Sequence, residues 1–201
     1  MQLTPDGAQA ILCTGSALYR LPLASGQPIR LARLTHAGGA WPCLAATNER
    51  AVYQDGDAIY SIALAGGAPS RLSAPPRSGA SIAFERLSLD GRWVIYTVEQ
   101  TANHTIAIYG APIAGGAPAL LQTGDRNTTW IISISGDYAI GVASGTLYAA
   151  PLRGGPRLQL SHGRFIDAFI FHSCPLGRPF LILNIPFRRT AATFGMTHRM
   201  I

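Results

Sequence analysis

The sequence predicts an all-β fold in which one four-stranded antiparallel unit is repeated about four times. Three observations support this prediction. First, one phrase starts at Leu18, Ile59, Ile108 and Leu147. It consists of an apolar residue, a tyrosine, alternating apolar residues and a glycine turn. Second, apolar residues within the phrase recur with a period of two, as in a strand. Third, the phrase tyrosines are 41, 49 and 39 residues apart, and spacings of about 40–45 residues are typical of propeller blades.

The recurring phrase is predicted to be the third strand of each unit. Its tyrosine shares one face with the residues two and four positions later, as Tyr60, Ile62 and Leu64 do in the second copy. We therefore expect the third strand to be buried mainly on one side. After each phrase the glycine turn leads to a short last strand, at 29–32, 70–73, 119–122 and 157–160.

Two further strands precede each phrase. The second strands are predicted at 10–14, 51–54, 93–98 and 138–143, and the clearest first strands at 41–47, 80–88 and 130–135. Hairpin turns at Thr14-Gly15, Asp55-Gly56 and Ser144-Gly145 join second to third strands, and we expect each glycine to supply a positive φ. The third copy has a longer link instead, at 98–105.

Four antiparallel strands in about forty residues make one blade of a β-propeller. Blades are predicted at about 1–34, 39–74, 79–122 and 127–161, with a partial fifth blade at 162–171. Blade 1 lacks most of its innermost strand. The prediction is therefore an incomplete β-propeller of about four blades, with strand edges and apolar blade faces left open to solvent. The alternative is a β-sandwich with four similar hairpins.

The residues from His172 to Ile201 form an atypical tail. All seven tyrosines and all three tryptophans lie before residue 149, whereas six of the seven phenylalanines lie from Phe165 onward. We hypothesise that this tail is out-of-frame or foreign sequence. Resequencing of the locus tests the hypothesis, and a clean in-frame reading of this tail contradicts it. The alternative is a genuine but divergent strand at 180–185.

Composition and charge favour a globular protein that does not bind nucleic acid. Hydrophobic residues make up 48% of the chain and charged residues 13%. The formal charge is +6, but all sixteen basic residues are arginines, and residues 162–201 contribute +4 of it. No aromatic residues interleave with the arginines as they do in a stacking platform. We also expect no membrane span, because no apolar run approaches about 18–20 residues. The N-terminus shows no signal peptide.

No catalytic, cofactor-binding or metal-binding residue is predicted. The chain contains no G-x-S-x-G, G-x-G-x-x-G, P-loop or H-E-x-x-H motif. Asp55-Gly56-Asp57 resembles the start of a calcium loop, but Gly66 stands where that loop needs its bidentate glutamate, so a hairpin turn is expected. The cysteines, the histidines and three candidate glutamates are scattered along the chain and form no recognised motif. They are Cys13, Cys43, Cys174, His36, His104, His162, His172, His198, Glu49, Glu85 and Glu99.

The role of the three tryptophans has two interpretations. Trp41 and Trp130 open predicted first strands near the central channel, where a ligand-binding propeller could place an aromatic side chain. We expect packing between blades instead, for these two and for Trp93, because each ring buries about 150–250 Å².

The third copy also carries a resemblance to a known family. The stretch from Leu89-Asp90-Gly91-Arg92-Trp93 through Ile108-Tyr109 to Gly115-Gly116-Ala117-Pro118 resembles the TolB-type, WD40-like (PD40) propeller repeat. Residues 3–7, LTPDG, match the same element. The resemblance covers about 160 residues, and the same repeats occur in the propeller domains of prolyl-oligopeptidase-type peptidases.

The resemblance implies a non-catalytic scaffold that binds another protein through its blade-connecting loops. It also implies a periplasmic or extracytoplasmic location for an intact protein. Open blade edges predict self-association. The alternative is the propeller portion of a prolyl-oligopeptidase-type serine peptidase whose hydrolase domain is absent from this chain. A weaker alternative is a lectin for a sugar or another small ligand.

Overall fold

The computed structural model describes residues 1–35, 44–75, 78–125, 129–161, 172–173 and 179–180. The chain divides into two compact units, Met1–Phe165 and Ile166–Ile201. In the second unit the described residues are β17 (His172–Ser173) and β18 (Pro179–Phe180), which pair antiparallel. The predicted partial fifth blade, at 162–171, lies outside the described residues, as does most of the predicted strand at 180–185. Among the described residues there is no helix with the length and apolar character needed to span a membrane.

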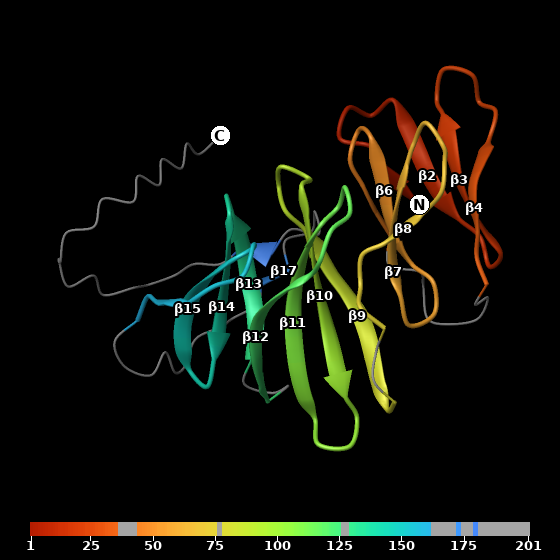
Figure 1. The fold of residues 1–201 in the computed structure, drawn as a ribbon. Coiled ribbons are helices and arrows are strands. Elements are labelled where there is room, and N and C mark those ends of the chain that lie inside the picture. Colours follow the sequence, from red (N-terminus) through yellow and green to blue (C-terminus); the bar gives the residue numbers. More distant parts are fainter. Residues whose placement is uncertain (36–43, 76–77, 126–128, 162–171, 174–178, 181–201) are drawn as a thin grey trace. The chain divides into compact units, whose positions relative to one another are not determined.

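The first unit holds four antiparallel sheets, each with four strands paired in chain order (Figure 1). Sheet 1 contains β1 (Gln2–Leu3), β2 (Gln9–Cys13), β3 (Ala17–Pro22) and β4 (Ile29–Arg33). Sheet 2 contains β5 (Leu44–Ala46), β6 (Arg50–Gln54), β7 (Ile59–Ala63) and β8 (Ser70–Arg71). Sheet 3 contains β9 (Ala80–Leu87), β10 (Trp93–Gln100), β11 (Thr105–Pro112) and β12 (Ala119–Asp125). Sheet 4 contains β13 (Thr129–Ser135), β14 (Tyr138–Ala143), β15 (Thr146–Pro151) and β16 (Leu158–Gln159).

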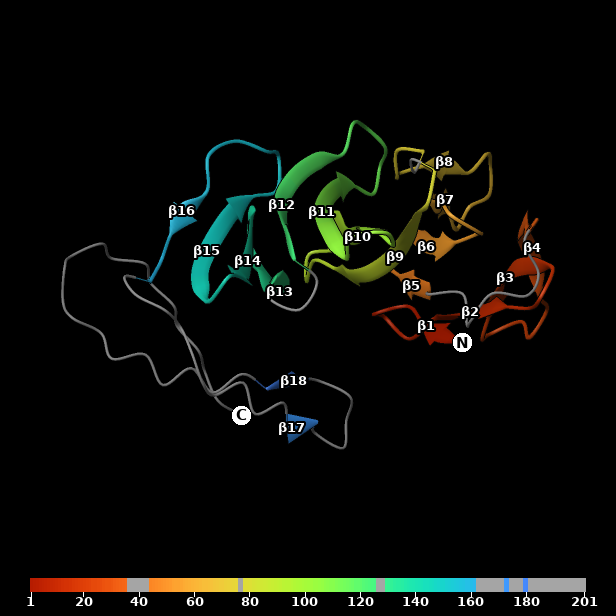
Figure 2. The same ribbon diagram turned by 90° about the horizontal axis from the view of Figure 1, so that it is seen from below.

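This architecture confirms the predicted all-β fold of four-stranded meanders. The innermost strand of sheet 1, β1, has only two residues, as expected for a blade that begins at its first turn. The four sheets follow one another in chain order (Figure 2). No core cluster in the described residues joins sheet 4 to sheet 1.

Each pair of consecutive sheets shares one apolar core. The core between sheets 1 and 2 includes Ile11, Leu18, Ile62 and Leu64. The core between sheets 2 and 3 includes Val52, Ile59, Ala111 and Ile113. The core between sheets 3 and 4 includes Ile106, Ile108, Ala150 and Leu152. In sheets 2, 3 and 4, the face that carries the phrase tyrosine therefore packs on the preceding sheet. We call this side of each sheet its tyrosine face.

The prediction that the third strand is buried mainly on one side is wrong for the middle sheets. In β7, Ile62 is buried toward sheet 1, while Ile59 is buried toward sheet 3. In β11, Ile108 and Ala111 are likewise buried on opposite faces. A sheet with a neighbouring sheet on each side has no face open to solvent, so its central strands carry apolar residues on both faces.

The hairpin turns differ from the sequence expectation in two places. Gly56 and Gly145 have φ values of 57° and 78° as predicted, but Gly15 does not have a positive φ. Its turn is closed instead by Thr14, whose Oγ1 accepts a hydrogen bond from the Ala17 backbone N–H at 3.1 Å. The expected long link of the third copy, at 98–105, is also wrong, because β10 and β11 extend into it and leave a turn at 101–104.

Candidate functional site

The turns between the first and second strands form a continuous polar row across the four sheets. We call residues 4–8, 47–50, 88–92 and 136–137 the turn row. The backbone N–H of Asp6 donates to Oδ1 of Asn48 at 3.0 Å, which joins sheets 1 and 2. A Cβ at Gly91 would lie 2.6 Å from Cγ2 of Thr47, so the turns of sheets 2 and 3 are in contact. Nη2 of Arg92 lies 3.7 Å from Oδ1 of Asp137 in sheet 4.

The turns of sheets 1 and 3 are held by the same local device. Thr4 Oγ1 donates to Asp6 Oδ1 at 2.6 Å, and Ser88 Oγ donates to Asp90 Oδ1 at 2.6 Å. Each carboxylate also accepts a backbone N–H from two residues on, as aspartate does in turns. These hydrogen bonds favour the charged form of the carboxylate. The hydroxyl of Thr4 and the N–H of Ala8 lower the pKa of Asp6. For Asp90, the hydrogen bond from the Ser88 hydroxyl is the largest cause, and together with Arg92 it lowers the pKa from 3.8 to about 2.

The lowered pKa of Asp90 predicts a pH dependence of stability. Because its folded pKa of about 2 lies below the unfolded value of 3.8, Asp90 stabilises the fold above about pH 4. This contribution is lost as the pH falls from about 4 toward 2. We expect Asp90→Asn to lower the melting temperature at pH 6 and to reduce its further fall between pH 4 and 2. The control is Asp57→Asn, which removes an exposed carboxylate outside the turn row. If the melting temperature of Asp90→Asn falls between pH 4 and 2 as steeply as that of the wild type, the prediction is contradicted.

A cleft of about 430 Å³ opens between sheets 1 and 2, beside the turn row. Its polar lining is Gln9, Arg20, Asn48, Glu49 and Arg50. Its apolar wall is Ala63, Leu64 and Ala65. The cleft therefore combines an apolar wall with a few polar residues.

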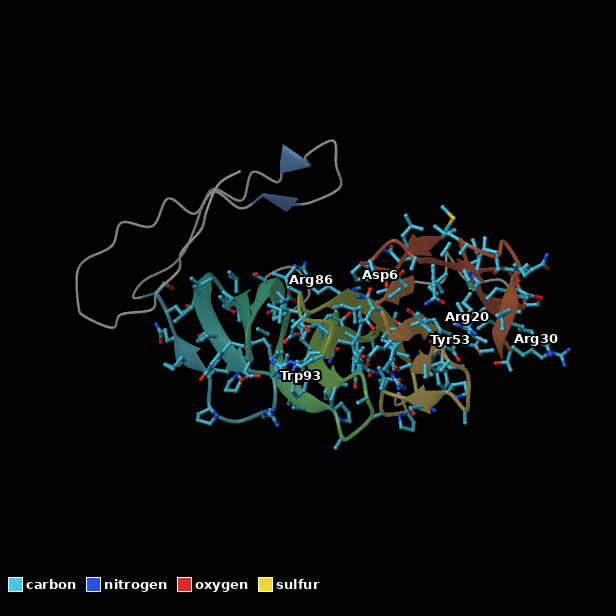
Figure 3. The ribbon with its side chains drawn as sticks, turned by 90° about the horizontal axis from the view of Figure 1, so that it is seen from above. Asp6, Arg20, Arg30, Tyr53, Arg86 and Trp93 are labelled. Carbon is cyan, nitrogen blue, oxygen red and sulfur yellow. The ribbon has the colours of Figure 1, made fainter. Side chains whose placement is uncertain are left out.

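A single residue difference explains why the cleft lies here. The position after the phrase tyrosine holds Ser61 in sheet 2 and Gly110 in sheet 3, and sheet 4 packs closely on Gly110. A Cβ at Gly110 would already lie 3.3 Å from the carbonyl oxygen of Leu152. In sheet 1 the same position holds Arg20 (labelled in Figure 3), which lines the cleft together with Leu64 of sheet 2. The large side chain prevents the close approach seen at Gly110.

Arg20 is the arginine whose side chain faces the cleft, and it has no carboxylate partner among the described residues. Nε of Arg20 is shielded from solvent and has no hydrogen-bond acceptor, while its Nη1 lies 3.5 Å from Oε1 of Gln9. The Arg50 side chain lies on the other face of sheet 2, since its Nε donates to Oγ of Ser61 at 2.7 Å and Ser61 shares the face of Val52 and Ile59 that packs toward sheet 3. Glu49 lines the same cleft but is exposed. The cleft therefore combines the positive charge of Arg20 with the negative charge of Glu49.

Residues that the sequence singled out lie in several places. Glu49 lines the cleft. Oε1 of Glu99, in β10, lies 3.9 Å from Nδ1 of His104, in the turn between β10 and β11. Trp93 is buried between sheets 3 and 4 beneath the guanidinium of Arg153, at 5.8 Å from the ring centre, which confirms the packing reading for this residue. The described structure excludes the side chains of Glu85, Trp130 and His172, and all of His36, Trp41, Cys43, His162, Cys174 and His198.

Asp55-Gly56-Asp57 forms a hairpin turn, as expected. The Asp55 N–H donates to the carbonyl of Ala58 at 2.9 Å. The Asp55 carboxylate accepts hydrogen bonds from the backbone N–H and the hydroxyl of Thr35 at 3.0 and 2.8 Å. Asp55 thus joins the chain that leaves sheet 1 to sheet 2, at the end of the sheets opposite the turn row.

The cleft itself was missed by the sequence analysis. The signal was present, because alignment of the four phrases places Arg20 against Ser61, Gly110 and Ala149. A long charged side chain at a position that is otherwise small marks a sheet interface that differs from the others.

Comparison with known proteins supports the fold and leaves the activity open. No family model matches the chain, and no curated protein matches it. A prolyl endopeptidase structure is similar with a TM-score of 0.53 and 14% identity, over 88% of this chain and 29% of that one. A protein assigned as TolB from Agrobacterium tumefaciens has a TM-score of 0.46 and 18% identity, over 81% and 61%. An oligogalacturonate lyase in complex with manganese has a TM-score of 0.48 and 15% identity, over 72% and 42%.

The prolyl endopeptidase match supports the predicted fold. Together with the four meander sheets, it identifies the fold of the first unit as a partial β-propeller. The chain spans less than two thirds of the length of each of the three structures.

Proposed function

We propose that this chain is a non-catalytic scaffold that binds another protein through the turn row. The observation that carries the proposal is the direct contact between the turns of consecutive sheets, at Asp6–Asn48, Thr47–Gly91 and Arg92–Asp137. Loops held in place by a rigid scaffold are common binding surfaces. A surface ordered before binding loses less conformational entropy when the partner arrives.

Site-specific photo-crosslinking tests this proposal. A photoreactive amino acid at Asp137 places the probe on the exposed side of the turn row, and one at Asn103 places it in the hairpin at the other end of sheet 3. In the native cells we expect a discrete protein adduct from position 137 and none from position 103. Arg92→Glu should reduce the adduct, because it reverses a charge of the row. No adduct from position 137, or equal adducts from both positions, contradicts the proposal.

The alternative is the propeller portion of a prolyl-oligopeptidase-type peptidase. The observation that favours it is the prolyl endopeptidase match, which covers 88% of this chain. The reading frames on either side of the coding sequence discriminate between the two functions. A G-x-S-x-G hydrolase domain in frame supports the peptidase, whereas further blades support the scaffold. For an intact scaffold we propose a location outside the cytoplasm, on the resemblance to TolB-type propellers, and cell fractionation tests it.

We further propose that a second copy of the chain covers the tyrosine face of sheet 1. In sheets 2 and 4 the leucine at the end of this face is buried, with Leu64 2% and Leu152 0% exposed. The equivalent Leu23 in sheet 1 is 50% exposed, because no described sheet precedes it. A face with the same apolar pattern as the covered ones is suited to pack on another sheet.

Self-association should therefore depend on Leu23. We expect Leu23→Glu to shift the chain toward monomer in sedimentation velocity at several concentrations. Leu158→Glu is the matched control, since Leu158 is 54% exposed on the edge strand β16. A wild-type chain that is monomeric at all concentrations contradicts this proposal, as does an equal effect of both variants.

A further inference from the structure

We propose that the chain associates head to tail, with the tyrosine face of sheet 1 in one copy packed on the opposite face of sheet 4 in another. This inference rests on the proposed self-association and adds the surface that the second copy supplies. We call the side of sheet 4 that carries Tyr138, Ile140, Ala149 and Leu158 its far face. It points away from sheet 3, because Ala139, which alternates with these residues along β14, belongs to the core shared with sheet 3.

The far face of sheet 4 has the pattern of a face that receives a following sheet. In sheet 3 the corresponding face carries Trp93 and Ile95, which are buried because sheet 4 packs on them. Tyr138 and Ile140 occupy the same places at the start of β14. Yet Tyr138 is 38% exposed and Ile140 is half-buried, since no described sheet follows sheet 4.

The tyrosine face of sheet 1 has the complementary pattern. Leu21 and Leu23 hold the places of Ala150 and Leu152, which are buried in the core that sheets 3 and 4 share. Leu21 is half-buried and Leu23 is exposed. Leu21 is larger than Ala150, while Tyr138 is smaller than the tryptophan at its place in sheet 3, so the two changes in side-chain volume oppose each other. The packing between sheets 3 and 4 therefore serves as the template for a contact between copies.

Exposed apolar side chains on both faces favour this contact over one between two sheet 1 faces. Leu3 pairs with Ala10, which puts it on the tyrosine face beside Leu23, and both leucines are exposed. Tyr138 and Leu158 are exposed on the far face of sheet 4. A contact between two sheet 1 faces would leave the far face of sheet 4 in water. A head-to-tail contact covers both apolar faces at once, and apolar surface removed from water stabilises association.

The proposed contact is limited to the half of the far face beside the turn row. At the other end of this face Val142 and Leu147 are already buried. Leu158 lies at the rim, because it holds the place of Ala119, which faces the glycine turn of the next sheet: a Cβ at Gly154 would lie 3.3 Å from Cβ of Ala119. Rim contacts contribute little to binding. We therefore expect Leu158→Glu to weaken association less than a charge at a central position.

Two charge variants, studied alone and mixed, test the head-to-tail contact. Leu23→Glu places a carboxylate on the tyrosine face of sheet 1, and Tyr138→Glu places one on the far face of sheet 4. Each variant alone spoils one side of every contact, so we expect at least tenfold weaker association than in the wild type by sedimentation velocity. A 1:1 mixture still offers one intact pair of faces. Native mass spectrometry should therefore find a heterodimer of the two variants.

Leu120→Glu is the matched control. Leu120 is exposed on β12 of sheet 3, which has a sheet on either side in chain order, so this variant should associate as the wild type does. A cooperative thermal melt of each variant checks that it is folded. If the wild type associates but the mixture forms no heterodimer, or if Tyr138→Glu associates as the wild type does, the head-to-tail contact is overturned while self-association through Leu23 stands. A wild-type chain that is monomeric at all concentrations overturns both.

Discussion

Leu152→Ala is expected to lower the free energy of unfolding by about 2–5 kcal/mol, the range for a large-to-small change in a packed core. Leu152 is fully buried and packs between sheets 3 and 4 with Ile108 and Trp93. It follows the third strand of sheet 4, and its N–H donates to the carbonyl of Asp137. Urea denaturation monitored by tryptophan fluorescence measures the change.

Leu23→Ala is the matched control for this prediction. Leu23 occupies the same repeat position in sheet 1, and its N–H donates to Ala8 in the equivalent way. Its tyrosine face lies against no described sheet, and half of the side chain is exposed. At a dilution at which the chain is monomeric, we expect a loss within about 0.5 kcal/mol, as for most surface substitutions. Equal losses in the two variants would show that the tyrosine face of sheet 4 is not an interface between sheets.

Gly91→Ala is the second prediction with a large effect, because the residue is constrained in two ways. Its φ of +67° costs a residue with a side chain about 1–2 kcal/mol. In addition, the new Cβ would lie 2.6 Å from Cγ2 of Thr47 in the neighbouring turn, which forces one of the turns to move. We expect a loss of more than about 2 kcal/mol in urea denaturation, since overpacking adds about 1–3 kcal/mol.

Gly7→Ala separates the two effects. Gly7 has the equivalent place in the turn of sheet 1, with a φ of +69°, but a Cβ there meets no atom within 4 Å. Gly7→Ala should therefore show the conformational cost alone. The difference between the two variants measures the contact between the turns of sheets 2 and 3. If the two losses are equal, the turn row is not continuous at Thr47.

The fold was predictable because the four phrases repeat one local pattern. Period-two alternation defined the strands, and the Asp-Gly and Gly-Gly pairs defined the turns between them. Gly15 was mispredicted because Thr14 closes its turn with a side-chain hydrogen bond, which makes a positive φ unnecessary. The third-copy link was mispredicted because residues 98–100, which include the polar Glu99 and Gln100, continue β10 and pair with β11.

The candidate site was less predictable because it depends on contacts between sheets. Asp90 and Gly91 were recognised as a turn, yet their sequence does not show that Thr47, from the preceding sheet, lies beside them. From the sequence alone, Arg20 is expected on the surface because arginines are mostly exposed. Only the packing of sheet 1 on sheet 2 places it in one cleft with Leu64.

The central claim is that the sheets are stacked in chain order, each in contact with the next. A disulfide between Thr47→Cys and Gly91→Cys tests it most directly, in a background where the native cysteines are serine. A Cβ at Gly91 would lie 3.4 Å from Cβ of Thr47, close to the usual separation in a disulfide. The control pair is Thr47→Cys with Gly136→Cys, in the turn of sheet 4. Mass spectrometry of the oxidised chain should find the 47–91 bridge and no 47–136 bridge. Equal amounts of the two bridges, or a 47–136 bridge alone, would contradict the stacking of neighbouring sheets.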